Sequence, residues 1–306
     1  MRVVVTGATG LIGAAAVKGL LEGGHEVVGL SRAVERARET LGGSIEAQPW
    51  PDPKTASPPL AALAGADAVL HLLGEPVAQR WSPAAKQEIL ESRVLGTRSL
   101  VAGIAAVPED RRPRTLVSQS ATGYYGPRGD EPIDESAAAG HDFLAEVTAA
   151  WENEARAAAP GIRVVLTRTG VVLSSRGGAL AKMLPPFRLG VGGPVAGGRQ
   201  YVPWIHLEDV VGGLLQCLGD ERASGPVNLT APNPVTNGEL SRTLGRVLHR
   251  PAILPVPGAA LRALYGEMAT IVITGQRVVP KRLQELGYRF RYRELEPALR
   301  DVLGRA

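Results

Sequence analysis

The sequence contains little sulfur and no long apolar segment. One cysteine, Cys217, occurs in 306 residues, which excludes an internal disulfide framework and is typical of a reducing compartment. No uninterrupted apolar run approaches the roughly 20 residues that a helix needs to cross a bilayer. The chain begins MRVVVTG, a strand pattern rather than a charged leader before an apolar core. We therefore expect a cytoplasmic location and no association with membranes.

Aromatic residues and lysines are also scarce. Aromatics form 4% of the chain, and the 34 basic residues comprise 29 arginines and 5 lysines, for a formal net charge of +4. A nucleic-acid-binding protein would gather its cations on one face or alternate them with stacking aromatics, whereas these are scattered. The sequence therefore predicts no nucleic-acid partner and favours anionic small molecules. The five histidines and the cysteine show no ligand spacing, so no metal site is predicted.

The first half of the chain alternates β-branched runs with helical patterns. This βαβα order predicts an α/β fold with a doubly wound parallel sheet. The expected strands are 2–6, 26–32, 66–74, 114–122 and 162–173, and the expected helices are 11–22, 83–105 and 141–159.

The character of the sequence changes after about residue 174. Glycine- and proline-rich segments at 190–206 and 225–236 are followed by helical patterns. We expect residues 174–306 to form a smaller substrate lobe with a C-terminal region of its own, over the carboxyl edge of the sheet. Later segments of it can return to that sheet. The expected helices of this part are 237–250, 258–274 and 293–303.

Three glycines follow the first predicted strand. Gly7, Gly10 and Gly13 form G-x-x-G-x-x-G between a strand and a helix. In a dinucleotide-binding turn the first glycine permits the sharp bend, the second lets the backbone approach the pyrophosphate, and the third lets the helix pack on the sheet. A plain turn would also tolerate glycines. The strand before and the amphipathic helix after favour a dinucleotide, so residues 1–173 are predicted to be a Rossmann domain.

The end of the second strand distinguishes NAD from NADP. An acidic residue there would bind the ribose 2′-hydroxyl, whereas an arginine accommodates a 2′-phosphate. The sequence has Ser31 and Arg32, with no acidic residue before Glu35. NADP is therefore favoured over NAD, the alternative being that Arg32 is only a solvated loop residue.

TGATGLIG (6–13) and SQSATGYYG (118–126) together resemble the short-chain dehydrogenase/reductase superfamily, in its extended branch of nucleotide-sugar epimerases and dehydratases. The segments 71–81, 190–211 and 275–288 narrow this to the atypical, NAD-dependent epimerase/dehydratase-like proteins, which carry a C-terminal domain of unknown function. The resemblance covers essentially the whole chain and implies cofactor contacts from several loops. Carried over by position, these are Gly7, Thr9, Gly10, Leu11, Ile12, Gly13, Ser31, Arg32, Leu72, Leu73, Glu88, Arg93 and Val172. Arg93 stands where asparagine is usual.

The resemblance also implies a catalytic Tyr-x-x-x-Lys pair, which is missing. The aligned positions are Phe143 and Val147, and the helix 141–159 contains no tyrosine or lysine. The hydroxyls that remain nearby are those of Ser120, Tyr124 and Tyr125, which are the candidate catalytic groups. Ser120 matches the serine that polarises the substrate oxygen in the extended enzymes. The alternative is that the tyrosines line or close the pocket without titrating.

Other residues are weaker candidates. His71 could touch the nicotinamide ribose or simply pack at the end of its strand. His206 and Asp209 are expected to be structural. In the distal lobe a cluster of arginine and aromatic residues could contact a phosphorylated or nucleotide-linked substrate, or could be scaffold: Arg188, Arg199, Gln200, Tyr201 and Trp204.

Two functional hypotheses are favoured over a third, a nucleotide-sugar 4-epimerase, which needs the missing tyrosine base. The first is an NADP-dependent, epimerase-like oxidoreductase with an atypical site, acting on a small-molecule substrate. The second is a non-catalytic NADP-binding sensor or regulatory protein, which the loss of the Tyr-x-x-x-Lys pair favours. A homodimer is compatible with either.

Overall fold

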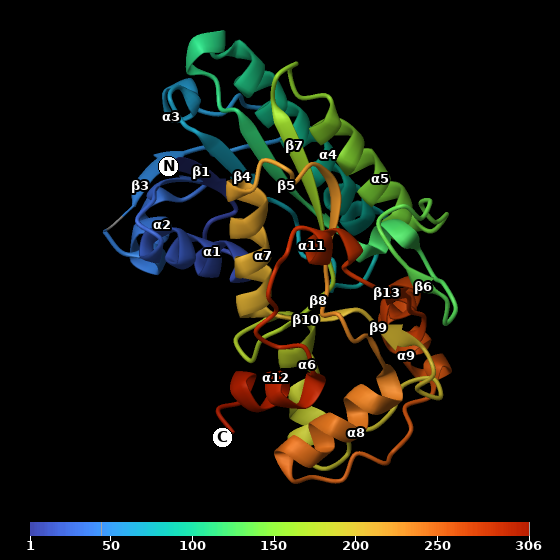
Figure 1. Ribbon diagram of the computed structural model, residues 1–306. Helices are drawn as coiled ribbons and strands as arrows, with labels where there is room; N and C mark the ends of the chain where they lie inside the picture. The colour runs from blue at the N-terminus through green and yellow to red at the C-terminus, as the bar shows by residue number, and fades with distance from the viewer. Residues whose placement is uncertain (44, 306) are drawn as a thin grey trace.

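A seven-stranded sheet lies at the centre of the computed structural model, which describes residues 1–43 and 45–305 (Figure 1). Its order is β11-β7-β5-β4-β1-β2-β3, and every neighbouring pair is parallel. The prediction of a doubly wound parallel sheet is confirmed. The strands are β1 (Arg2–Thr6), β2 (Glu26–Ser31), β3 (Glu46–Pro49), β4 (Ala68–His71), β5 (Thr115–Ala121), β7 (Arg163–Thr169) and β11 (Gly225–Leu229).

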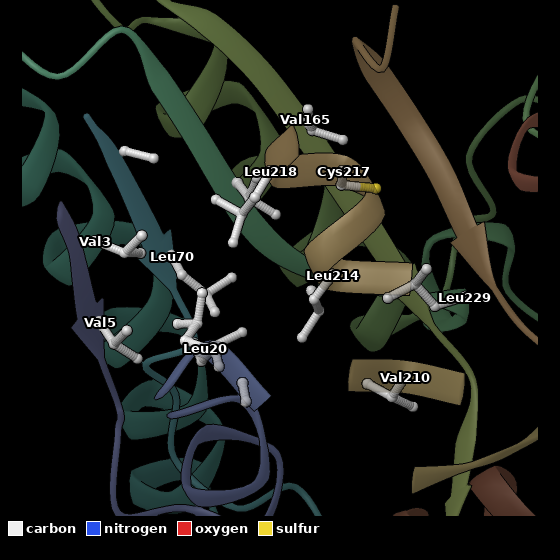
Figure 2. Packing of buried hydrophobic residues seen from close by; sticks show 14 of the residues in the cluster. Val3, Val5, Leu20, Leu70, Val165, Val210, Leu214, Cys217, Leu218 and Leu229 are labelled. Carbon is white, nitrogen blue, oxygen red and sulfur yellow. The ribbon is translucent and has the colours of Figure 1, made fainter. Parts of the chain in front are cut away.

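The middle of β1, Val3–Val5, is apolar and buried because helices cover both faces of the sheet. Val3 and Val5 of β1 pack in one core cluster with α1 (Leu11–Glu22) and α7 (Leu207–Gly219), as Figure 2 shows for Leu20, Val210 and Leu214. Val4, which points the other way, packs in a second cluster with α3 (Leu60–Leu63), α4 (Pro83–Ala106) and α5 (Phe143–Arg156). The two faces of one strand thus enter two cores.

Several local features differ from the sequence prediction. The run 162–173 is divided by Gly170 into β7 and β8 (Val171–Leu173), because the chain passes the Pro203 carbonyl so closely that a Cβ at Gly170 would overlap it. The helix α2 (Val34–Leu41) and strand β3 were not predicted. The expected helix 258–274 is three short elements, α9 (Gly258–Tyr265), the 3-10 turn η3 (Gly266–Ala269) and α10 (Thr270–Ile273).

The smaller lobe extends from the carboxyl edge of the sheet and is drawn in yellow to red in Figure 1. A third core cluster unites α6 (Gly178–Arg188), α8 (Asn237–Leu248) and α12 (Leu295–Val302). Its short strands pair as β8 with β10 (Trp204–His206) and β9 (Tyr201–Val202) with β12 (Val235–Thr236).

The chain returns to the sheet after residue 173. Helix α7 covers one face, and β11 pairs with β7 as the edge strand. The remaining short elements connect these parts: η1 (Glu109–Arg111), η2 (Thr122–Tyr125), β6 (Pro132–Ile133), β13 (Arg277–Val278) and α11 (Lys281–Glu285).

Candidate functional site

The glycine turn after β1 is built as its sequence predicts. Gly7 has φ +65°, and a Cβ there would lie 2.5 Å from the carbonyl oxygen of Leu72. A Cβ at Gly13 would overlap the Gly7 carbonyl oxygen, so only glycine lets the helix start so close to the strand. A Cβ at Gly10 would meet only the Gly7 oxygen, at 3.3 Å, so its outer side is open to a ligand. The turn lies between β1 and β4, where the strand order reverses and α/β sheets bind ligands.

The N-terminus of α1 is suited to an anion. Gly10 supplies no side-chain cap, and the first turn contains no acidic residue. The first backbone N–H groups of a helix have no partner inside the helix and carry a partial positive charge. Thr9 is exposed, and Leu11 and Ile12 are partly exposed, so this end of the helix can bind a phosphate.

Ser31 and Arg32 lie at the same edge of the sheet, because β2 runs parallel to β1. The Ser31 hydroxyl donates to the Ala33 carbonyl oxygen, and the Ala33 backbone N–H donates to Ser31 Oγ. The Arg32 side chain is exposed, and no ion pair to it is formed within residues 1–43 and 45–305. Its guanidinium is therefore available to an anion.

The other predicted cofactor residues do not all lie beside the glycine turn. Leu72 and Leu73 follow β4 beside the glycine turn, and Val172 is partly exposed in β8. Glu88 instead accepts a 2.7 Å hydrogen bond from the Lys54 ammonium on the surface of α4. Arg93 lies one turn further along that helix, where its guanidinium donates to the carbonyl oxygen of Ile89.

A cavity of about 370 Å³ opens where the sheet edge meets the lobe. On the sheet side its wall includes the segments that follow β5 and β7 and the cavity-facing side of α5, and on the lobe side it includes α6, α8, β9 and α10. The residues that line the cavity include Trp81, Arg93, Thr122, Leu144, Val147, Thr148, Trp151, Leu180, Met183, Tyr201, Val202, Leu240, Ile271 and Val272.

Arg93 is the cation of this wall. Its guanidinium carbon lies 5.2 Å from the centre of the Trp151 ring, a cation–π distance. Burial lowers the pKa of Arg93 to about 10, and the charge of Glu75 opposes that shift. The group is still cationic at neutral pH and is only weakly neutralised, so it can stabilise negative charge in the cavity.

The candidate catalytic hydroxyls lie in a buried polar network. Ser120 donates a 2.6 Å hydrogen bond to Glu152, and Tyr125 donates a 2.7 Å hydrogen bond to Asn228. Arg168 binds both carboxylate oxygens of Glu152, at 2.8 and 2.9 Å, and also donates to the Tyr125 hydroxyl. Ser120 and Tyr125 have no exposed surface.

This network shows what surrounds the hydroxyls of the catalytic hypothesis, which stays a prediction. Burial, the largest effect, raises the pKa of Tyr125 to about 12, against the nearby Arg168 charge. The Tyr124 ring stacks on the Arg168 guanidinium, 3.5 Å from its carbon. Backbone neighbours Ala121, Thr122 and Gly123 line the cavity, but Ser120, Tyr124 and Tyr125 do not. Ser120 and Tyr125 are thus buried behind the cavity wall, and partly exposed Tyr124 packs on Arg168 outside the cavity lining.

Helix α5 presents an apolar face at the positions where the resemblance implies a Tyr-x-x-x-Lys pair. Leu144, Val147, Thr148 and Trp151 line the cavity, at i, i+3, i+4 and i+7. Phe143 points elsewhere and packs edge-on against Trp81, with ring centres 5.0 Å apart. Val147 of the aligned pair thus reaches the cavity and Phe143 does not.

The remaining histidine and lobe candidates are mostly structural. His71 is fully buried between the Thr6 and Thr97 hydroxyls. The His206 ring accepts from the backbone of Glu208 and caps α7. Buried Asp209 accepts two backbone N–H groups and the hydroxyl of Tyr288, which anchors the C-terminal segment.

Among the lobe candidates for substrate contact, only Tyr201 lines the cavity. Trp204 is fully buried and donates to the Asn233 carbonyl oxygen. Gln200 donates to the carbonyl oxygens of Val195 and Val272, and Arg199 borders a separate surface depression. The sequence reasoning missed Trp151, Leu144 and Leu240, although the spacing of Leu144 and Trp151 on one helix face was a readable signal.

These features define a fold of the Rossmann type with a second, smaller lobe. The model of the NAD dependent epimerase/dehydratase family matches residues 3–229, and a domain of unknown function (DUF1731) matches residues 256–302. The chain belongs to the NAD dependent epimerase/dehydratase family.

Relatives are similar over nearly the whole chain. The chloroplastic homologue of epimerase family protein SDR39U1 from Arabidopsis thaliana is 43% identical, over 99% of this chain and 87% of the relative. The crystal structure of human epimerase family protein SDR39U1 (isoform 2) with NADPH is 34% identical, with a TM-score of 0.89 and full coverage of both chains. A UDP-glucuronic acid 4-epimerase from Bacillus cereus, at 15% identity and a TM-score of 0.81 over 100% of this chain and 98% of that one, shares the fold.

The part of the chain that the structure describes contains neither a helix that could cross a membrane nor a cluster of metal ligands. No helix among residues 1–43 and 45–305 is long and apolar enough to cross a membrane. Within the same ranges, no three histidine, cysteine, aspartate or glutamate side chains are grouped as metal ligands would be.

Proposed function

We propose that this chain binds NADP(H) at the carboxyl edge of its sheet and is an oxidoreductase for a small-molecule substrate held in the adjoining cavity. The observation that carries the proposal is the shared edge. The open Gly10 turn, the uncapped start of α1 and exposed Arg32 lie at the carboxyl edge of the sheet, and the segments that follow β5 and β7 at the same edge line the cavity. The human relative crystallised with NADPH supports the choice of nucleotide.

Different residues of the chain would bind the nucleotide and the substrate. Backbone N–H groups at the start of α1 bind the pyrophosphate, and Arg32 binds the 2′-phosphate. When bound, NADP(H) supplies or accepts a hydride. Arg93 stabilises the negative charge that develops on the substrate oxygen, as preorganised donors do in a water-poor site. Trp151, Val147 and Leu144 exclude water from that site.

A second function, that of a non-catalytic NADP-binding sensor, is favoured by one observation. No tyrosine or lysine occurs on α5, and the nearby Ser120 and Tyr125 hydroxyls are held in the Glu152–Arg168 network. A sensor would bind the nucleotide as tightly as an enzyme. It would not oxidise NADPH, whichever carbonyl compound is added.

The nucleotide preference is tested by titrating NADPH and NADH and following nicotinamide fluorescence. We expect wild type to prefer NADPH. Arg32→Glu should weaken NADPH binding roughly 10- to 100-fold, as loss of charged hydrogen bonds does, and leave NADH binding nearly unchanged. Arg114→Glu is the control, since exposed Arg114 precedes β5 at the opposite edge of the sheet and the change in net charge is the same.

Failure to bind either nucleotide would overturn the proposed function. An unchanged ratio of the two affinities in Arg32→Glu would overturn the assignment of Arg32 to the 2′-phosphate.

A further inference from the structure

The lobe side of the cavity is mainly apolar. Its wall includes Leu180 and Met183 of α6, Val202, Leu240 of α8, and Ile271 and Val272 of α10. Polar residues also line it, and the side chains of Asn237, Thr274 and Gln276 are hydrogen-bonded to backbone groups. The basic side chain that lines the cavity, Arg93, belongs to the sheet side. A substrate that extends into the lobe therefore meets aliphatic surface, which favours apolar groups by about 25 cal/mol per Å² buried.

A nucleotide sugar fits this wall poorly. Its diphosphate would need several cations or N–H donors, because burying an unpaired charge is costly. Arg199 and Arg242 line a different depression, on the surface, and Arg188 is exposed at the end of α6. None of the three lines the cavity.

One polar group in the wall lacks a partner. The Trp151 side chain is 3% exposed, and its Nε1 has no hydrogen-bond partner among the residues that the structure describes. An indole N–H is a donor only, and leaving it unpaired costs roughly 1–3 kcal/mol. The Arg93 guanidinium stacks over the same ring, so two donors belong to one part of the wall. They call for an acceptor on the ligand.

Part of the cavity wall is exposed apolar surface. Ile271 and Val272 line the cavity and are also 38% and 41% exposed. Exposed apolar residues that border a pocket favour an apolar ligand.

We propose that the cavity binds an apolar, uncharged carbonyl compound, whose oxygen accepts a hydrogen bond from Trp151 Nε1–H next to Arg93 and whose hydrocarbon part lies in the lobe. This rests on the proposed function and names its substrate class. Reduction of such a ketone forms a C–H bond with the hydride of NADPH and an O–H bond with a proton from water. The products are a secondary alcohol and NADP⁺.

The test is isothermal titration calorimetry on protein saturated with NADP⁺, in which no hydride can pass to a ketone. Three probes are compared: 1-acetonaphthone, the matched hydrocarbon 1-ethylnaphthalene, and UDP-glucose. We expect the ketone to bind more tightly than the hydrocarbon, and UDP-glucose to bind weakly or not at all.

Two variants isolate the indole donor. Trp151→Phe should weaken acetonaphthone binding roughly 3- to 10-fold more than ethylnaphthalene binding, the worth of one hydrogen bond. Trp81→Phe is the matched control, because Trp81 also lines the cavity but its Nε1 already donates to the Val77 carbonyl oxygen. Trp81→Phe should weaken the binding of both naphthalenes equally.

Met183→Trp provides a second measurement should Trp151→Phe fold poorly. Filling the lobe end of the cavity should abolish acetonaphthone binding and leave NADPH binding intact. Tight UDP-glucose binding with no naphthalene binding would overturn the inference and leave the proposed function standing. So would equal losses for both naphthalenes in Trp151→Phe. Absence of nucleotide binding would instead refute the proposed function itself.

Discussion

Ser120 donates a 2.6 Å hydrogen bond to Oε1 of Glu152, and both side chains are buried. The bond joins β5 to α5, and Arg168 of β7 binds the same carboxylate through two nitrogens. Burial alone would lower the pKa of Arg168, but its hydrogen bonds to Glu152 and the neighbouring charges raise it. The network therefore fixes the cavity face of α5, and it uses the serine that resemblance assigns to the substrate.

Replacing this serine tests its structural role. Ser120→Ala should lower the free energy of unfolding by about 1–3 kcal/mol, because Glu152 loses a charge-assisted bond, while NADPH affinity stays the same. Urea unfolding and a fluorescence titration measure the two. Ser118→Ala is the control, since buried Ser118 makes only a 3.5 Å hydrogen bond. Normal stability together with lost turnover in Ser120→Ala would restore the catalytic assignment.

The ion pair behind the serine should matter more. Glu152→Gln leaves the Arg168 charge buried without its partner, and breaking a buried pair in this way costs about 3–5 kcal/mol. The free energy of unfolding in urea measures the loss. Glu154→Gln on the same helix removes a pair with Arg98, which is 60% exposed, and should cost less than about 1 kcal/mol. Similar losses of unfolding free energy in both variants would show that the buried network stabilises the protein no more than the exposed ion pair does.

The glycine turn gives a prediction with a clean control. Gly13→Ala forces a Cβ into the Gly7 carbonyl oxygen, so we expect displacement of α1 and loss of NADPH binding. Gly219→Ala, where a Cβ meets nothing within 4 Å, should leave binding unchanged. Wild-type NADPH affinity in Gly13→Ala would mean that the nucleotide does not use this turn.

Histidine burial predicts how stability depends on pH. Burial lowers the pKa of His71 from 6.5 to about 3, so the unfolded state binds the proton more readily between these values. Stability should therefore fall as the pH drops below 6.5, by up to about 1.4 kcal/mol per pH unit. Urea unfolding at several pH values measures the slope.

His71→Gln should flatten that slope in the part of the range above carboxyl titration. A residual slope of the same sign is expected from His206, whose pKa burial also lowers. An unchanged slope in His71→Gln would show that His71 binds a proton equally well in the folded and unfolded states.

Local patterns in the sequence predicted the sheet and the glycine turn, because both depend on residues close together in the chain. Gly7, Gly10 and Gly13 are contiguous with the strand and helix that they join. The cavity could not be predicted in the same way. Its walls bring Trp151 to Leu240 and Ile271, and only tertiary packing sets which faces meet.

The surroundings of two candidate residues follow the same logic. Ser120 has the residue type and position of a catalytic serine, but a partner 32 positions away, Glu152, takes its hydroxyl. Trp204 is an aromatic residue in a conspicuous motif, and its indole N–H is satisfied within the core. Sequence indicates which side chains can do chemistry, and the burial of each decides whether they do.

The proposed function is tested most directly by incubating the protein with NADPH and 1-acetonaphthone and quantifying NADPH and 1-(1-naphthyl)ethanol by chromatography. We predict that alcohol forms in an amount equal to the NADPH lost, and that Met183→Trp, which fills the cavity, forms none. Tight NADPH binding without any consumption of NADPH, with this ketone or with any other carbonyl compound, would contradict the prediction. That result would identify the chain as a nucleotide-binding sensor.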